Sequence, residues 1–84
     1  MQLIDQVRSF ILSNFYVANP ETVFDDTSLL DSGIVDSTGV LEIISFIEAT
    51  FGVTVDDSEM LPENLDSIDA IAGFVKRKTE TVAA

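Results

Sequence analysis

Apolar residues recur every three or four positions at the start of the chain. They are Leu3, Ile4, Val7, Ile11 and Phe15. This spacing places them on one face of a helix, with polar residues such as Asp5 and Ser9 on the other face. Pro20 lacks a backbone donor and biases Asn19 away from the helical region, so we expect the helix to fade between Asn14 and Asn19.

A second helical pattern begins after a long connection. Its apolar face consists of Val40, Ile43, Ile44, Ile47 and Phe51. Asp36 or Ser37 can cap its start, and Gly52 suits its end because glycine tolerates the left-handed conformation. The pattern therefore predicts a helix from Ser37 to Phe51.

The opposite face of this second helix is mostly polar. At about 100° per residue it carries Thr38, Leu41, Glu42, Ser45, Glu48 and Ala49. Leu41 is an apolar side chain beside two carboxylates. A single exposed leucine is usually without consequence, but in this place it could also contact a partner.

The connection between the two predicted helices covers residues 20–35. Its apolar residues are Val23, Phe24, Leu29, Leu30, Ile34 and Val35. A connection of this length is uncommon in a compact domain unless it is packed or functional, and these residues indicate that it is packed. Pro20–Thr22 can open a short turn, because proline suits a first helical position.

The last third of the chain predicts one short helix and one longer helix. Residues 53–55 alternate too briefly for a strand, so we expect a packed linker there. A short helix fits within residues 59–65 if Pro62 lies in its first turn or in a loop. The final helix starts after Asp66 or Ser67. Its buried residues are Ile68, Ile71, Ala72 and Val75.

Lys76, Arg77 and Lys78 form the only basic cluster of the sequence. In the final turn of the last helix they would complement the helix dipole. We expect residues 79–84 to form a flexible C-terminal tail, which leaves residues 1–78 as the folded domain. The pattern as a whole predicts an all-α chain.

The composition limits the possible functions. A chain of 84 residues has room for one domain, and 46% apolar residues are enough for it to fold. Fifteen acidic residues against four basic ones give a net charge of −11. This charge repels nucleic-acid phosphates and anionic lipids, so we expect neither nucleic-acid nor membrane binding.

Cysteine and histidine are both absent from the chain. Their absence excludes disulfides and thiolate metal sites and removes the usual general bases, which argues against an enzyme. A hydrolase built on carboxylates would need two acids that converge in a cleft. The longest uncharged stretch is too short to span a membrane, and the start lacks the basic region of a signal peptide. We expect a cytoplasmic monomer.

The acidic residues are concentrated in the middle of the chain. Between positions 9 and 75 there are 13 acids and no base. The simpler interpretation is a solvated surface that keeps the protein dissolved. The alternative is a docking face for basic partners.

Residues 31–42 match a calcium-binding EF-hand loop at its first and last ligand positions. Gly33 and Val35 stand where side-chain oxygens are required, and Asp36 occupies the position that requires glycine. We therefore predict no dedicated metal site.

Ser37 admits two interpretations. It can simply cap the second helix, which is the commoner role of a serine at such a position. It cannot act alone as a nucleophile, because no base capable of activating it is visible. A hydroxyl at an exposed helix start can nevertheless be modified by another enzyme, since the helix N-terminus favours an added phosphate.

The run from Leu30 to Glu42 resembles the phosphopantetheine attachment motif of acyl carrier proteins. It has an Asp-Ser pair at the start of the second helix and a Glu five residues after the serine, and it is preceded by a Leu-x-x-x-Gly that runs from Leu29 to Gly33. The resemblance extends over most of the chain and implies a right-handed four-helix bundle. Three helices would be long and one short, with a long loop between the first and second.

The resemblance also implies a cofactor and a role. Ser37 would carry covalent 4'-phosphopantetheine, transferred from coenzyme A by a separate magnesium-dependent phosphopantetheinyl transferase. Asp36 would take the role associated with transferase and metal contacts. The arm ends in a thiol that holds cargo as a thioester, so the chain needs no cysteine of its own.

Further partners implied by the resemblance are acyl or aminoacyl ligases, acyltransferases and synthases with basic docking patches. They would contact the second helix at Thr38, Leu41, Glu42, Ser45 and Glu48. Thr38 and Gly39 differ from the Leu or Met and the acid that follow the serine in many fatty-acid carriers. The sequence therefore looks closer to specialised free-standing carriers, including those loaded with amino acids. The alternative is a small acidic helical interaction module that is never modified.

Overall fold

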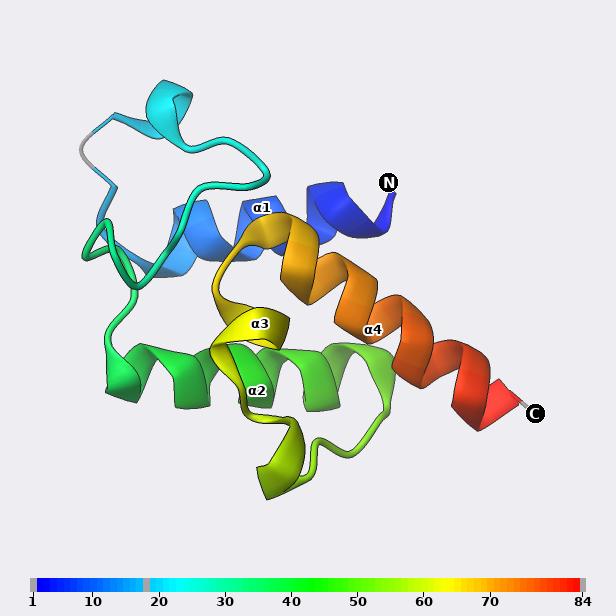
Figure 1. Ribbon diagram of the computed structural model, residues 1–84. Coiled ribbons are helices and arrows are strands. Elements are labelled where there is room, and N and C mark those ends of the chain that lie inside the picture. The colour runs from blue at the N-terminus through cyan, green and yellow to red at the C-terminus, as the bar shows by residue number, and fades with distance from the viewer. Residues whose placement is uncertain (1, 18, 84) are drawn as a thin grey trace.

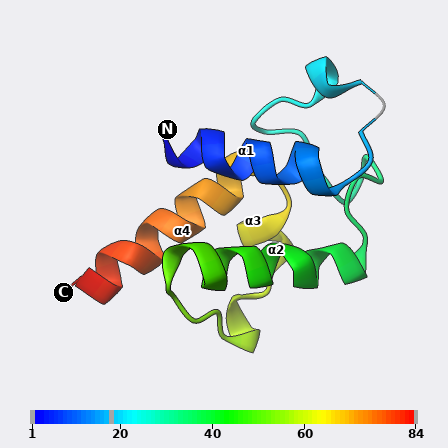
Figure 2. The same cartoon turned by 180° about the vertical axis from the view of Figure 1, so that it is seen from behind.

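The computed structural model describes residues 2–17 and 19–83, and its regular structure there is entirely helical. The four helices are α1 (Leu3–Asn14), α2 (Ser37–Phe51), α3 (Pro62–Leu65) and α4 (Ile68–Ala83), with short 3₁₀ turns at Pro20–Thr22 and Asp57–Glu59. The predicted all-α fold with three main helices and one short helix is thus confirmed. α1 and α2 lie side by side and run in opposite directions, and α4 crosses them obliquely (Figures 1 and 2).

Both ends of α2 agree with the sequence pattern. Asp36 caps α2, because its Oδ1 accepts a hydrogen bond of 2.7 Å from the backbone N–H of Gly39. Gly52 ends α2 in the left-handed conformation at φ 69°. The sequence left Asp36 and Ser37 as alternative caps, and the structure selects Asp36.

The two residues before α4, which the sequence offered as alternative caps, have different roles. Ser67 is the cap, since its Oγ accepts a hydrogen bond of 3.0 Å from Ala70 N–H. Asp66 instead fixes the long loop between α1 and α2. Its carboxylate accepts hydrogen bonds from Ser28 Oγ at 2.7 Å and from Leu30 N–H at 2.8 Å.

The C-terminal helix is longer than the sequence pattern indicated. α4 continues to Ala83, into residues assigned to a tail, so the basic cluster does not lie in its last turn. Two of these cations instead contact the segment around α3. Lys78 Nζ lies 2.8 Å from Glu59 Oε1, and Arg77 Nη2 donates to Asn64 Oδ1 at 3.2 Å. Ala84 lies outside the described residues.

The core is built from the three long helices and the segments between them. Its fully buried large side chains are Ile11, Leu29, Ile43, Ile47, Ile68, Ile71, Val7 and Val75. The expected packed linker is present, since Val53 and Val55 are buried. The expected short helix begins at Pro62, the first helical position, where its missing donor does no harm.

One expected anchor of the long loop is wrong. Val23 is buried, but Phe24 is 63% exposed. Arg8 on α1 explains the difference, because it donates to Val23 O at 2.7 Å and to Asp25 Oδ1 at 2.6 Å. With both neighbours held by one guanidinium, the side chain of Phe24 is directed outward.

None of the described helices has the length and apolar character that crossing a membrane requires.

Candidate attachment site at the start of α2

Ser37 is the first residue of α2 and is exposed. Its side chain makes no hydrogen bond with any other part of the chain that the structure describes. The capping role falls to Asp36, so the hydroxyl of Ser37 remains available. A phosphate ester on this hydroxyl would lie next to the unpaired N–H groups of a helix N-terminus, which favour an anion. The site therefore fits a phosphate-linked group.

Asp36 is fixed next to Ser37 by its cap hydrogen bond to Gly39. Its backbone is extended, and the residue is exposed. One carboxylate oxygen is used within the chain, and the charged group still faces solvent. This geometry allows the transferase contact expected of Asp36.

Gly39 is a site residue whose role was missed by sequence reasoning. It is buried, and a Cβ at this position would lie 2.7 Å from Phe15 Cε1 and 3.0 Å from Val35 Cγ1. Only glycine lets the end of α1 and the long loop approach the first turn of α2 so closely. A glycine inside a helix costs about 1 kcal/mol relative to alanine, and this cost is the sequence signal for a close approach.

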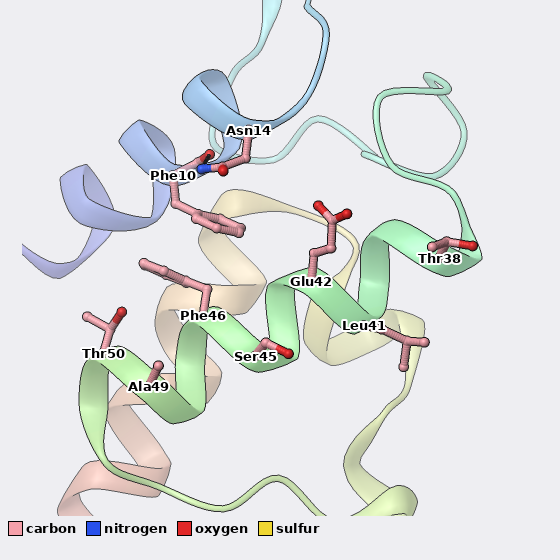
Figure 3. A pocket seen from close by; sticks show the side chains of 9 residues that line it. All are labelled: Phe10, Asn14, Thr38, Leu41, Glu42, Ser45, Phe46, Ala49 and Thr50. Carbon is pink, nitrogen blue, oxygen red and sulfur yellow. Dashed lines mark hydrogen bonds between the residues drawn. The ribbon is translucent and has the colours of Figure 1, made fainter.

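Four of the predicted partner-binding residues are brought together in one groove between α1 and α2. Thr38, Leu41, Glu42 and Ser45 are all exposed and line it (Figure 3). The other lining residues are Phe10, Asn14, Phe46, Ala49 and Thr50. The groove therefore has a wall from α1, which the periodicity of α2 alone did not indicate.

Glu48, the fifth predicted partner residue, is not part of this groove. It is half-buried, and its Oε2 accepts a hydrogen bond of 2.9 Å from Val55 N–H. Glu48 thus ties the end of α2 to the linker that follows. The helical periodicity of the sequence did not predict this structural role of Glu48.

The site lacks the side chains that usually activate a serine hydroxyl. The chain has no histidine or cysteine to activate Ser37. Within the described residues, no three Asp or Glu side chains form a group that could hold a metal ion. The arrangement can present a hydroxyl to another enzyme.

Comparison with known proteins gives the same picture. The family described as "Phosphopantetheine attachment site" matches residues 5–75. An acyl carrier protein of Campylobacter hominis is 29% identical over 76 residues, which cover 90% of this chain and 92% of that protein. Members of this family are carriers rather than catalysts, and their cofactor is covalent 4'-phosphopantetheine, which supplies the thiol for a thioester. With 71 of its 84 residues inside the matched region (5–75), the chain belongs to the acyl carrier protein family.

Proposed function

We propose that Ser37 is the attachment residue, and that the protein holds an acyl or aminoacyl group as a thioester and presents it to partner enzymes. The observation that carries this assignment is the exposed Ser37 hydroxyl at the first position of α2, with the cap supplied by Asp36. Ser37 has no bond within the described chain to lose on modification, and the helix N-terminus stabilises the added charge.

The modification transfers the phosphopantetheinyl group of coenzyme A from a pyrophosphate linkage to a serine hydroxyl. A bond forms between Ser37 Oγ and the phosphorus next to pantetheine in coenzyme A. The pyrophosphate bond of coenzyme A breaks, adenosine 3',5'-bisphosphate leaves, and the serine proton passes to the transferase or to water. In this step Asp36 contacts the transferase, and α2 holds the hydroxyl in place.

We propose that the cargo is small. A narrow apolar pocket of about 70 Å³ lies between the long loop, α2 and the segment around α3. Its lining residues are Leu30, Val40, Met60, Leu61, Pro62 and Leu65. A long chain would have to displace these side chains, whereas a short acyl group or a small aminoacyl group would not.

Intact-mass measurement tests the attachment. The protein is incubated with coenzyme A, magnesium and a broad-specificity phosphopantetheinyl transferase. We expect the mass of one phosphopantetheine to be added to the wild type and to Ser45→Ala, and none to Ser37→Ala. Ser45→Ala is the matched control because Ser45 is an exposed serine on the same helix.

Failure to add phosphopantetheine to the wild type would favour the alternative, an unmodified acidic interaction module. Modification of Ser37→Ala at the wild-type rate would show that the attachment residue is a different one.

A further inference from the structure

We propose that the docking surface for partner enzymes extends from α2 onto α1, and that this aromatic groove takes an apolar side chain of a basic partner protein. The groove is the one lined by Phe10, Asn14, Glu42 and Phe46 together with their neighbours on α2 (Figure 3). This inference names the partner surface of the proposed carrier and rests on that function. Its new element is the contribution of α1.

The floor of the groove is a pair of stacked aromatic rings. Phe10 of α1 and Phe46 of α2 point toward one another, with ring centroids 4.1 Å apart and planes 14° from parallel (Figure 3). Phe15 meets the edge of this pair at 6.0 Å from Phe10, and Phe51 meets it at 5.7 Å from Phe46. All four rings are half-buried. Together they form an apolar row whose outer side faces solvent.

This row is prepared for binding before a partner arrives. Because the rings are already held against one another, little side-chain freedom is lost when another apolar group is placed on them. Aromatic residues in such fixed positions often carry most of the energy of a protein interface. The polar rim, formed by Asn14, Thr38, Ser45 and Thr50, supplies hydrogen-bonding groups around the row.

The charge of the groove decides which partner it fits. Glu42 is the only charged residue among the described residues that line it, and its carboxylate points into the space between α1 and α2 (Figure 3). No basic residue lines the groove, and two of the four cations of the chain are engaged elsewhere, Arg8 at Asp25 and Lys78 at Glu59. A partner must therefore supply the positive charge. A second copy, with its net charge of −11, would be repelled.

The position of the groove also suits a carrier. The rise of about 1.5 Å per residue puts Phe46 roughly 13 Å along α2 from Ser37. A partner that seats a side chain on the Phe10–Phe46 pair would thus hold α2 while leaving Ser37 uncovered. Recognition and cargo transfer would use neighbouring parts of one helix.

The test uses the Ser37→Ala protein, so that its result does not depend on phosphopantetheine. The probe is a synthetic amphipathic peptide of leucine and lysine, and the same peptide with glutamate in place of lysine is the control. In an NMR titration we expect the lysine peptide to shift the signals of Phe10, Asn14, Glu42 and Phe46, with binding that weakens as salt is added. We expect no binding of the glutamate peptide.

Three variants assign the contacts. Phe10→Leu should weaken binding about fivefold, because it removes half of the ring pair but keeps an apolar side chain. Glu42→Gln should weaken it about twofold. Phe24→Leu is the matched control, since Phe24 is an exposed ring on the long loop, and it should change nothing.

Equal binding by the Phe10→Leu and Phe24→Leu proteins would overturn the proposal. So would signal changes confined to Asp25 and Asp26 or to Asp56–Glu59, or concentration-dependent shifts in the absence of peptide, which would indicate self-association. The amide NMR spectrum of each variant shows whether it is folded. Glu42→Gln replaces an exposed side chain, so it still tests the groove if the Phe10→Leu protein does not fold.

Discussion

At the scale of single residues, the neighbours of Ser37 determine whether its hydroxyl is available and how closely α1 can approach. Asp36 takes the capping hydrogen bond, and the Ser37 hydroxyl is available as a result. Gly39 leaves room for the ring of Phe15. The same glycine looked like a departure from fatty-acid carriers in the sequence, and its packing against α1 gives it a structural reason.

Gly39→Ala should destabilise the protein by about 1–2 kcal/mol. The added Cβ would lie 2.7 Å from Phe15 Cε1, and the overpacking outweighs the gain of about 1 kcal/mol in helix propensity. Gly73→Ala is the matched control in α4, because its Cβ would meet only Arg77 Nη1, at 3.6 Å. That variant should be stabilised by up to about 1 kcal/mol. Urea unfolding measures both, and equal stability of the two variants would contradict the proposed close approach.

Glu48→Ala should lower the free energy of unfolding by about 1–2 kcal/mol, because the backbone N–H of the buried Val55 then loses the carboxylate to which it donates. Glu42→Ala, at an exposed residue of the same helix for which no hydrogen bond is found within the described chain, should change it by less than about 0.5 kcal/mol. Sequence reasoning treated the two glutamates alike. Urea unfolding that finds the two variants equally stable would remove the structural role assigned to Glu48.

At the scale of elements, the sequence predicted helix starts and ends best where a local signal marks them. Gly52 ends α2, and the capping residues before α2 and α4 were found to within one position. The end of α1 at Asn14 lies at the beginning of the range in which Pro20 led us to expect it. The end of α4 was misplaced because no proline or glycine follows Lys78. The α1 wall of the groove was also missed, since it depends on how two helices pack, and periodicity treats each helix alone.

The segment before α3 is held to α4 by Glu59, and this tie should depend on pH. The hydrogen bond from Lys78, followed by that from Asp56 N–H, lowers the pKa of Glu59 below its ordinary value. A carboxyl with a lowered folded-state pKa contributes stability above its unfolded pKa and loses it as the pH falls through the folded value.

Glu59→Gln should therefore be less stable than the wild type at pH 7. The difference should shrink as the pH falls below the ordinary glutamate pKa of about 4.3, and it should disappear once the pH is below the lowered pKa of Glu59 in the folded protein. Urea unfolding of both proteins from pH 7 to low pH measures the difference in stability. Titration of the other acids affects both proteins alike and drops out of this difference. Glu63→Gln, an exposed acid in α3, is the control and should show no such dependence. A stability difference that persists unchanged in acid would contradict the assigned tie.

At the scale of the whole molecule, the acidic charge has two effects. The chain has a net charge of −11, and α2 presents Ser37 at its start and Glu42 on its exposed side. The charge favours basic partners and at the same time repels itself within the fold. Both effects are screened by salt.

Sodium chloride should raise the melting temperature at pH 7, by roughly 4 °C or more if the relief of repulsion reaches about 1 kcal/mol. Near pH 4.1, where the net charge approaches zero, the same salt should have little effect. Calorimetry at the two pH values makes the comparison. A melting temperature independent of salt at pH 7 would mean that self-repulsion does not limit stability.

The central claim is that Ser37 carries the phosphopantetheine, and fragmentation of the modified protein by mass spectrometry tests it most directly. The protein is isolated from cells that contain a phosphopantetheinyl transferase, digested and sequenced. We predict that the added mass lies on the peptide that contains Ser37, that fragmentation places it on this serine, and that Ser37→Ala carries none. A modification placed on another residue, such as Ser32 or Ser45, or an unmodified Ser37 in protein that is otherwise loaded, would contradict the account.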